Sequence, residues 1–484
     1  MSEFSEKIKE AIKKSNLTMP YLSEMCGLSV PNLYKICQGK RLPKEKDKII
    51  ALIEALQCPK SEEVSLIKKY QIELLGKNEY CCLETVRELL SKVGRKEHIG
   101  MYYYGKAMDP DIDVLLGKTE CIRYVQQMLM QETEENPGGI VKIIGGENND
   151  YLLESIRFVF MNSETVCRHI IRLDSKSVPE SDLRNIRLVA SILPSALCGS
   201  SYCPFYFYEY GKVKNNKIQL FHSAVILRNK VILLLDDYDK AVILKSSEQI
   251  ELLNQVFDSY LEDSIPMVRH VDDLYHWQKL IGKMETENRK RVSYVLENKA
   301  CTMSVMDESF IQNHVTEHTP EAEQALKKYM DEITAIRKDR EVCYSTKSGL
   351  LDFAATGRIE YIPEKLYTPL TARERIEILE KMKESRQENS KCYILNDSRF
   401  SVSDHLFVAA ISESENIIGY YTGLDRFSAC LLDEKGIASW IYQFLRYLED
   451  SDLVLSGEET MQLVDQVIYD LEQGRFPETP SASV

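Results

Sequence analysis

Apolar residues recur at helical spacing through the first 75 residues of the chain. Phe4, Ile8, Ala11 and Ile12 fall on one face of a helix that would run from Phe4 to Lys14. The same spacing predicts four further short helices, over Met19 to about Cys26, Val30 to about Gln38, a segment through Ile49 and Ile53, and Ser61 to Leu75. Residues 1–75 are therefore expected to form a small all-α domain.

Polar residues and glycines mark the ends of these short helices. Thr18 and Ser29 stand where N-caps are expected, because a hydroxyl can accept a hydrogen bond from the first free backbone N–H groups. Gly27 and Gly39 follow the second and third helices, and glycine readily adopts the left-handed conformation that ends a helix. Two short helices joined by a tight turn that contains glycine predict a helix-turn-helix.

From about Leu115 the pattern changes to alternating helical and strand-like segments. Residues 76–115, which include a helical run from Tyr80 to Val93, read as a connector. The alternating segments are a helix near Glu120–Glu134, a strand Gly139–Gly145, a helix Asp150–Met161, a strand Val166–Leu173, a helix Ser181–Leu197 and a strand-rich stretch Tyr206–Leu244. Such alternation is typical of an α/β domain.

The pentapeptide YLEDS occurs at Tyr260–Ser264 and again at Tyr447–Ser451. Both copies end an amphipathic segment that follows an apolar strand-like run, so residues 229–264 and 416–451 are expected to form the same strand–strand–helix unit. The predicted fold class is multidomain, with an all-α helix-turn-helix head followed by a duplicated, two-lobed α/β body. The domains are expected at 1–75 (head), 76–115 (connector), 116–290 (first lobe), 291–456 (second lobe) and 457–484 (a last helix and a disordered tail).

Charge is unevenly distributed over the 484 residues. Residues 1–70 carry 13 Lys and Arg against 9 Asp and Glu, a net +4, which leaves −18 on the rest of a chain whose net charge is −14. A basic head on an acidic body suggests that the head contacts a polyanion. The sequence has no apolar run of 18 residues, no N-terminal signal core and, among 13 cysteines, no C-x-x-C pair. A cytoplasmic protein with reduced thiols, no membrane contact and no metal or other cofactor is expected.

The stretch LTMPYLSEMCGLSVPNLYKICQGKRLP, residues 17–43, resembles the Cro/repressor family, also called the xenobiotic-response-element type. That family has a Leu-Ala pair in its first motif helix, a Gly in the turn, an aliphatic residue in the recognition helix and a Gly after it. Here the corresponding residues are Leu22-Ser23, Gly27, Leu33 with Ile36, and Gly39. Met19 stands where the family often has glutamine, and methionine cannot hydrogen-bond a phosphate or a base. The resemblance covers about residues 4–70 and implies a transcriptional regulator that binds double-stranded DNA.

The second motif helix carries the candidate base contacts, because its N-terminal turns would lie on base edges in the major groove. Asn32 can pair with an adenine edge, Lys35 can reach guanine or a phosphate, and Val30 can contact a thymine methyl. Phosphate contacts, which add affinity without reading sequence, are expected from Lys40, Arg41 and Lys44. So few base contacts per head favour a homodimer whose body dimerises or senses an unknown small molecule or peptide. The alternative is a helical bundle with solvated faces that binds protein.

The stretch LFHSAVILRNKVILLLDDYD in the body resembles the phospholipase-D superfamily motif H-x-K-x-x-x-x-D. His222 stands at the histidine position, Ala224 at the lysine position and Asn229 at the aspartate position. In that superfamily the histidine attacks phosphorus and the lysine stabilises the developing charge. Without the lysine no enzymatic activity is expected and no catalytic residue is assigned. The alternative is a DNA-tethered phosphodiesterase or nuclease, rescued by a metal bound to Asp236, Asp237 and Asp239.

Two weaker features leave alternatives open. Residues Ile143–Asp150 join a predicted strand to a predicted helix, so their amides could hold a phosphate, or the segment could be an ordinary turn. His314 and His318 are four residues apart but lack the H-E-x-x-H pattern of a zinc site, so both are expected to be exposed.

Overall fold

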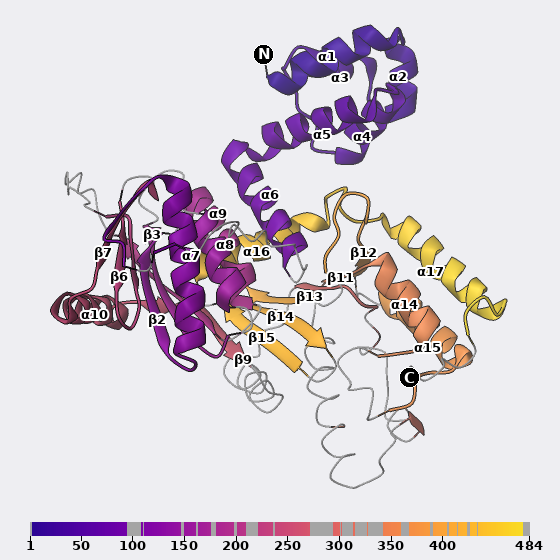
Figure 1. Ribbon diagram of the computed structural model, residues 1–484. Coiled ribbons are helices and arrows are strands. Elements are labelled where there is room, and N and C mark those ends of the chain that lie inside the picture. Colours follow the sequence, from indigo (N-terminus) through magenta and orange to yellow (C-terminus); the bar gives the residue numbers. More distant parts are fainter. Residues whose placement is uncertain are drawn as a thin grey trace. The chain divides into compact units, whose positions relative to one another are not determined.

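A computed structural model of the chain separates it into two compact units, Met1–Glu84 and Thr85–Val484 (Figure 1). An N-terminal helical region is thus followed by an α/β body. The structure describes residues 2–93, 108–109, 111–146, 150–160, 163–175, 181–197, 201–209, 221–235, 238–271, 294–300, 302, 313–314, 327, 342–359, 367–387, 391–403, 406–413, 415–423, 426–432 and 434–477. The predicted tail beyond residue 477 lies outside this range.

The helical unit contains the short helices that the apolar spacing predicts. They are α1 (Glu3–Ser15), α2 (Met19–Cys26), α3 (Val30–Cys37), α4 (Lys46–Ala55) and α5 (Lys60–Leu75), followed by α6 (Lys77–Lys92). The Thr18 side chain caps α2 by accepting a hydrogen bond from the Tyr21 N–H at 3.4 Å. Ser29 occupies the N-cap position of α3, but its side chain makes no capping hydrogen bond.

One apolar core holds this unit together. Residues from α1 to α5 contribute to it, and several are fully buried, including Phe4, Leu22, Leu33 and Leu52. The rings of Phe4 and Tyr70 lie 5.5 Å apart, and the Tyr70 hydroxyl donates a 2.8 Å hydrogen bond to the Pro43 carbonyl. Burial raises the pKa of Tyr70 to about 12, so this hydroxyl stays a donor at neutral pH. Tyr70 therefore fixes the loop that follows α3.

The α/β unit alternates helices and strands from residue 114 onward. Up to residue 271 the elements are β1 (Val114–Leu116), α7 (Lys118–Glu135), β2 (Ile140–Gly145), α8 (Asp150–Phe160), β3 (Val166–Asp174), α9 (Ser181–Leu197), β4 (Tyr202–Glu209), β5 (Ser223–Ile226), β6 (Val231–Leu234), β7 (Lys240–Leu244), α10 (Ser247–Glu262), β8 (Ile265–Pro266) and β9 (Val268–Val271). The later elements are β10 (Tyr294–Glu297), β11 (Val342–Ser345), α14 (Lys347–Thr356), α15 (Ala372–Gln387), β12 (Lys391–Ile394), β13 (Leu406–Ser412), β14 (Glu415–Gly423), β15 (Arg426–Leu432), α16 (Lys435–Leu448) and α17 (Gly457–Glu472).

These strands form two mixed sheets. The first has the order β1-β7-β6-β5-β2-β3-β4-β8 and the second has the order β12-β11-β10-β13-β14-β15-β9. In the first sheet β2, β3 and β4 are parallel, β5 runs antiparallel to β2, and β5, β6 and β7 form an antiparallel meander whose last strand pairs with β1.

The second sheet has the same arrangement of strands. β10, β11 and β12 are parallel, β13 runs antiparallel to β10, and β13, β14 and β15 form an antiparallel meander whose last strand pairs with β9. Strand by strand, β1 to β7 of the first sheet thus correspond to β9 to β15 of the second. As expected, residues 229–264 and 416–451 each fold as strand, strand and helix, here β6–β7–α10 and β14–β15–α16.

This correspondence explains the position of β9. The sequence places Val268–Val271 within a first lobe that ends at residue 290, but β9 hydrogen-bonds to β15 in the second sheet, with Val268 opposite Leu432. β9 is the counterpart of β1, which precedes the first sheet's other strands in the same way. The second sheet therefore begins before residue 290, and the division between the sheets falls between β8 and β9.

Helices cover both faces of the first sheet. Phe257 of α10 is fully buried against Ala224, Ile226 and Val231, and α7 and α8 lie on the opposite face (Figure 1). On the second sheet, α14, α15 and α17 share one core with Val295 of β10, and Figure 1 shows α17 running beside α14 and α15. The other face carries α16, where the Tyr344 hydroxyl donates a 2.7 Å hydrogen bond to the Leu445 carbonyl.

Candidate nucleic-acid interface

Helices α2 and α3 are joined by a three-residue turn, Gly27-Leu28-Ser29. Gly27 has φ +65°, a left-handed conformation that residues with a Cβ rarely adopt, so glycine ends α2 here at little cost. Leu28 is buried in the core and anchors the turn. Ser29 and Pro31 then start α3, since the fixed φ of proline suits the first turn of a helix. The chain thus contains the two-helix geometry that the sequence predicts.

The residues of α3 that are not buried in the core form its outward face. Leu33, Ile36 and Cys37 are buried. The exposed positions follow at i, i+3, i+4 and i+7, which is one face of a helix: Pro31, Tyr34, Lys35 and Gln38. Lys35 therefore lies where the sequence expects it, whereas Val30 and Asn32 are only partly exposed and flank this face.

Two further residues of this face are candidate DNA contacts that the sequence analysis does not name. Tyr34, with 51% of its surface exposed, and Gln38 lie on the same helical face as Lys35. A glutamine amide can pair with an adenine edge, and a tyrosine hydroxyl can contact a phosphate. The signal was present in the sequence, because Tyr34 and Lys35 lie three and four residues after Pro31 and Gln38 lies three residues after Lys35, which places all four on one helical face.

A basic turn follows the end of α3. Gly39 has φ +67°, its N–H bonds to the Ile36 carbonyl at 2.9 Å, and the Lys40 N–H bonds to the Lys35 carbonyl at 2.9 Å. This is the Schellman arrangement, which reverses the chain immediately after a helix. The cations that follow are exposed: Lys40, Arg41 and Lys44.

Arg41 is joined to the candidate base-contacting helix by a side-chain hydrogen bond. Its Nη1 donates to the Asn32 amide oxygen at 2.9 Å. This contact occupies the amide oxygen and leaves the Asn32 NH₂ group as the part that can still act as donor to a ligand. The sequence predicts separate DNA contacts for Asn32 and Arg41, whereas in the structure the two side chains are hydrogen-bonded to each other.

In the body, the position that the phospholipase-D resemblance assigns to lysine is part of the apolar core. Ala224 is 1% exposed and packs with Ile170, Ile226 and Phe257, whereas His222 is exposed. Even a lysine at this position would point into the core beneath α10. Asp236 and Asp237 lie outside the described residues, so the metal-assisted alternative stays a hypothesis.

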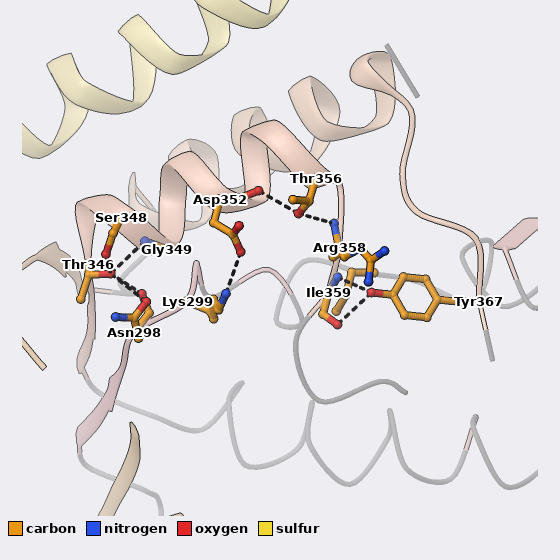
Figure 2. Close-up of polar contacts among 10 residues, drawn as sticks. All are labelled: Asn298, Lys299, Thr346, Ser348, Gly349, Asp352, Thr356, Arg358, Ile359 and Tyr367. Atoms are coloured by element: carbon orange, nitrogen blue, oxygen red, sulfur yellow. Dashed lines mark hydrogen bonds and ion pairs between the residues drawn. The ribbon is translucent and has the colours of Figure 1, made fainter. Parts of the chain in front are cut away.

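Polar side chains gather at the carboxyl ends of β10 and β11, but they pair with each other (Figure 2). Thr346 caps α14 by accepting from the Gly349 N–H at 2.9 Å, and its hydroxyl donates to the Asn298 carbonyl. Lys299 forms a 2.6 Å ion pair with Asp352. A Cβ on Gly349 would overlap the Asn298 carbonyl oxygen, so the close approach of α14 to β10 requires glycine. These contacts fasten α14 to the sheet.

His314 is not exposed, contrary to the sequence-based expectation. It is 7% exposed, its Nε2 lies 2.8 Å from Oε1 of Glu374 and its Nδ1 lies 3.0 Å from the Thr368 carbonyl. It therefore connects the start of α15 to the preceding loop. His318 and residues 147–149 of the proposed phosphate turn lie outside the described residues.

Comparisons with known proteins add little to this geometry. No protein-family model matches the sequence, and no curated protein matches it. Among solved structures, an archaeal chromatin protein, TrmBL2, whose structure shows a mode of DNA binding, is similar with a TM-score of 0.21 and 15% identity over 55% of this chain and 94% of that chain. Polyphosphate kinase from Porphyromonas gingivalis is similar with a TM-score of 0.23 and 12% identity over 73% of this chain and 54% of that chain. Both TM-scores are too low to establish a shared fold or function.

The described helices also bear on membrane contact. None of them combines the length and the continuous apolar character that a bilayer span requires.

Proposed function

We propose that this protein is a sequence-specific DNA-binding regulator of transcription, in which α3 is the recognition helix. The observation that supports this most is the exposed face of α3, where Tyr34, Lys35 and Gln38 continue into the basic turn at Lys40, Arg41 and Lys44. A helix in the major groove needs hydrogen-bonding side chains on its outer face, and flanking cations that neutralise phosphates position it there. The buried Leu33 and Ile36 make this face rigid.

Dimerisation through the body would bring the head of a second copy of the chain to the same DNA. We infer that the body is an internal duplication, because β1 to β7 of the first sheet have the same order as β9 to β15 of the second and only β8 has no described counterpart. This agrees with the resemblance between the two YLEDS segments. A homodimer brings two recognition helices to two half-sites, which compensates for the few base contacts of each head. The body's net negative charge keeps it from competing with the head for DNA.

DNA binding is tested by charge-matched substitutions in the purified full-length chain. Genomic fragments that the wild-type protein retains are first selected, and dissociation constants are then measured at several salt concentrations. Lys35→Ala is expected to weaken binding to a selected fragment by about 1–3 kcal/mol relative to unselected DNA, because it removes a base contact. Lys13→Ala, an exposed lysine of α1, removes the same charge and is the control. Equal affinities for these two variants would exclude α3 as the recognition helix.

Arg41→Ala is expected to act differently from Lys35→Ala. Loss of one phosphate contact should weaken all sequences alike and reduce the slope of log K against log salt by about one unit. Because Arg41 also holds the Asn32 amide, Asn32→Ala in the Arg41→Ala background should cost less affinity than Asn32→Ala alone. Additive losses would show that the contact between these two side chains is not used on DNA.

We also propose that the body has no phosphodiesterase activity. The burial of Ala224 supports this, since a phosphoryl-transfer site needs a cation near the reacting phosphorus. Purified protein is incubated with a generic phosphodiester and with nucleic acid, with and without magnesium, manganese and zinc. Turnover that disappears in His222→Ala would overturn the proposal and restore the enzyme alternative.

A further inference from the structure

Two cysteines face each other across neighbouring strands of the second sheet. Cys343 lies on β11 and Cys392 on the parallel strand β12, and the register places them directly opposite one another. Residues paired across neighbouring strands point to the same face of a sheet. The strands are about 4.8 Å apart, which lies within the range of about 4.4–6.8 Å between Cα atoms that a disulfide can bridge.

The two thiols have different surroundings. Cys343 is completely buried, whereas Cys392 is partly exposed. β12 is the last strand at its end of the second sheet, so no further described strand lies beside it. An oxidant in solution can therefore reach Cys392 but not Cys343.

A buried carboxyl group contacts the inner thiol. Glu297, at the end of β10, is 0% exposed, and the Cys343 Sγ donates to its Oε1 at 3.7 Å. Such a carboxyl holds the thiol in place and can take up its proton. Among the described residues no group of three or more His, Cys, Asp or Glu side chains could hold a metal ion, so the pair does not belong to a metal site there.

We propose that Cys343 and Cys392 form a disulfide when the protein is exposed to a peroxide, and that they constitute a redox-sensitive site of the body. Hydrogen peroxide transfers one oxygen to the Cys392 sulfur, which becomes a sulfenic acid, and its other oxygen leaves as water with the proton of the Cys392 thiol. The Cys343 sulfur then attacks the sulfenic sulfur, the S–S bond forms and the hydroxyl leaves. The Cys343 proton passes to Glu297 and from there to the departing hydroxide, which completes a second water.

The position of β12 at the sheet edge suits a reversible bond. Side chains paired across strands lie about 4.8 Å apart, but disulfide Cβ atoms are about 3.8 Å apart, so one strand must move inward. Among the described residues, backbone hydrogen bonds on the outer side of β12 begin only after Cys392, where the Leu455 N–H bonds to the Ile394 carbonyl at 2.8 Å. The part of β12 that carries Cys392 can therefore make this movement more easily than a strand held on both sides. Disulfides that form with such strain are the more easily reduced ones.

The first sheet provides an internal control. Cys167 on β3 and Cys203 on β4 occupy the strands that correspond to β11 and β12, but Cys167 pairs with Tyr202, and Cys203 pairs with Arg168. This offset of one residue turns the two sulfurs to opposite faces of the sheet. Cys203 is partly exposed, like Cys392, so it reports how a partly exposed thiol behaves when the residue opposite it on the neighbouring strand is not a cysteine.

The test is peptide mapping of the folded full-length protein after mild treatment with hydrogen peroxide. Free thiols are blocked, the protein is digested with trypsin, and peptides are identified by mass spectrometry. The expected product is peptide 341–347 joined to peptide 392–399, and dithiothreitol should separate them. Cys392→Ser and Cys343→Ser should each abolish this product, and Cys203→Ser should leave its yield unchanged.

Glu297→Gln distinguishes a role in proton transfer from simple proximity of the thiols. It should slow disulfide formation about 100-fold, the lower end of what proton transfer by a positioned side chain contributes, while the Cys392 sulfenic acid, trapped with dimedone, accumulates. Circular dichroism of each variant verifies that it is folded. The proposal is wrong if Cys392 is oxidised without becoming linked to Cys343, if Cys203 forms linked peptides as readily, or if the product appears only in denaturant.

Discussion

His169 illustrates how burial fixes the protonation of a single side chain. It is 0% exposed on β3, its Nε2 lies 2.7 Å from the Gly145 carbonyl and its Nδ1 lies 2.8 Å from the Tyr202 hydroxyl. A carbonyl can only accept, so Nε2 carries the proton and Nδ1 accepts from Tyr202. Burial lowers the pKa of His169 from 6.5 to about 4, although the hydrogen bond to Gly145 opposes this shift. The ring is therefore neutral at pH 7.

The lowered pKa of His169 predicts a loss of stability in mild acid. Above pH 6.5 the ring is neutral in both states and contributes no pH dependence. Between pH 6.5 and about 4 only the unfolded chain takes up the proton, so the free energy of unfolding should fall by up to about 3 kcal/mol as pH drops through this window. Urea unfolding at intervals from pH 7 to 4 measures this change.

His169→Gln removes the titrating group but keeps an N–H that can reach the Gly145 carbonyl. Its free energy of unfolding should depend less on pH across this window than that of the wild type. His222→Gln, at an exposed histidine, is the control and should follow the wild-type curve. A His169→Gln curve parallel to the wild-type curve would show that other groups cause the acid sensitivity.

At the scale of elements, the two YLEDS segments end their helices in the same way. The Ser264 N–H bonds to the Leu261 carbonyl at 3.1 Å, and the Ser451 N–H bonds to the Leu448 carbonyl at 3.0 Å. Each serine hydroxyl also donates to a carbonyl of the last helical turn, Tyr260 in α10 and Leu448 in α16. The identical pentapeptide thus has the same local function in both helices.

The two serines differ in burial, so their hydroxyl groups are expected to contribute differently to the free energy of unfolding. Ser451 is 7% exposed and its Oγ also accepts from the Leu453 N–H at 3.2 Å, whereas Ser264 is partly exposed. Ser451→Ala should reduce the free energy of unfolding by about 1 kcal/mol, because it leaves buried polar groups without a partner. Ser264→Ala should change it by less than about 0.5 kcal/mol, since water can replace the hydroxyl. Chemical denaturation compares the two, and equal effects would contradict this assignment.

The helices themselves differ in the same way. α16 buries Ile437, Ile441 and Phe444, and it packs against α9. α10 buries Phe257 but exposes Leu252, Val256 and Tyr260. Both helices have an apolar stripe in the sequence, but only one lies between the two sheets, so periodicity could predict the helices but not their burial.

At the scale of the whole molecule, a hydrogen bond joins the first sheet of the body to the helix α16 that covers the second sheet. The hydroxyl of Tyr208, on β4, donates to the carboxylate of Glu434, which is 1% exposed. Glu434 also caps α16 by accepting from the Gly436 and Ile437 N–H groups at 2.9 and 2.6 Å. The same carboxylate thus fixes the start of α16 and holds it to the first sheet.

This contact predicts an energetic coupling between the two sheets. Tyr208→Phe should lower the free energy of unfolding by about 1–2 kcal/mol, because the hydrogen bond to the carboxylate is lost. The same substitution should have a smaller effect in a Glu434→Gln background. Tyr469→Phe, at an exposed tyrosine, is the control for removal of a hydroxyl. Additive effects of Tyr208→Phe and Glu434→Gln in denaturant unfolding would exclude the coupling.

The sequence alone determined the short-range features of this protein. Helices α1 to α5 follow from apolar spacing and from caps such as Thr18 and Gly27, since these signals act within one or two helical turns. The alternation of helices and strands and the repeated strand–strand–helix unit are local in the same sense. The exposed position of Lys35 was also predictable, because helical geometry places it opposite Leu33.

The features that depend on pairing distant segments follow from the assembled fold and not from any local pattern. β9 belongs to the second sheet because it pairs with β15, more than 150 residues later. The register that brings Cys343 opposite Cys392 and the burial of Ala224 and His314 arise in the same way. A strand's partner and register are set by the total burial of the assembled sheet. That quantity depends on every strand at once, so no local stretch of the sequence contains it.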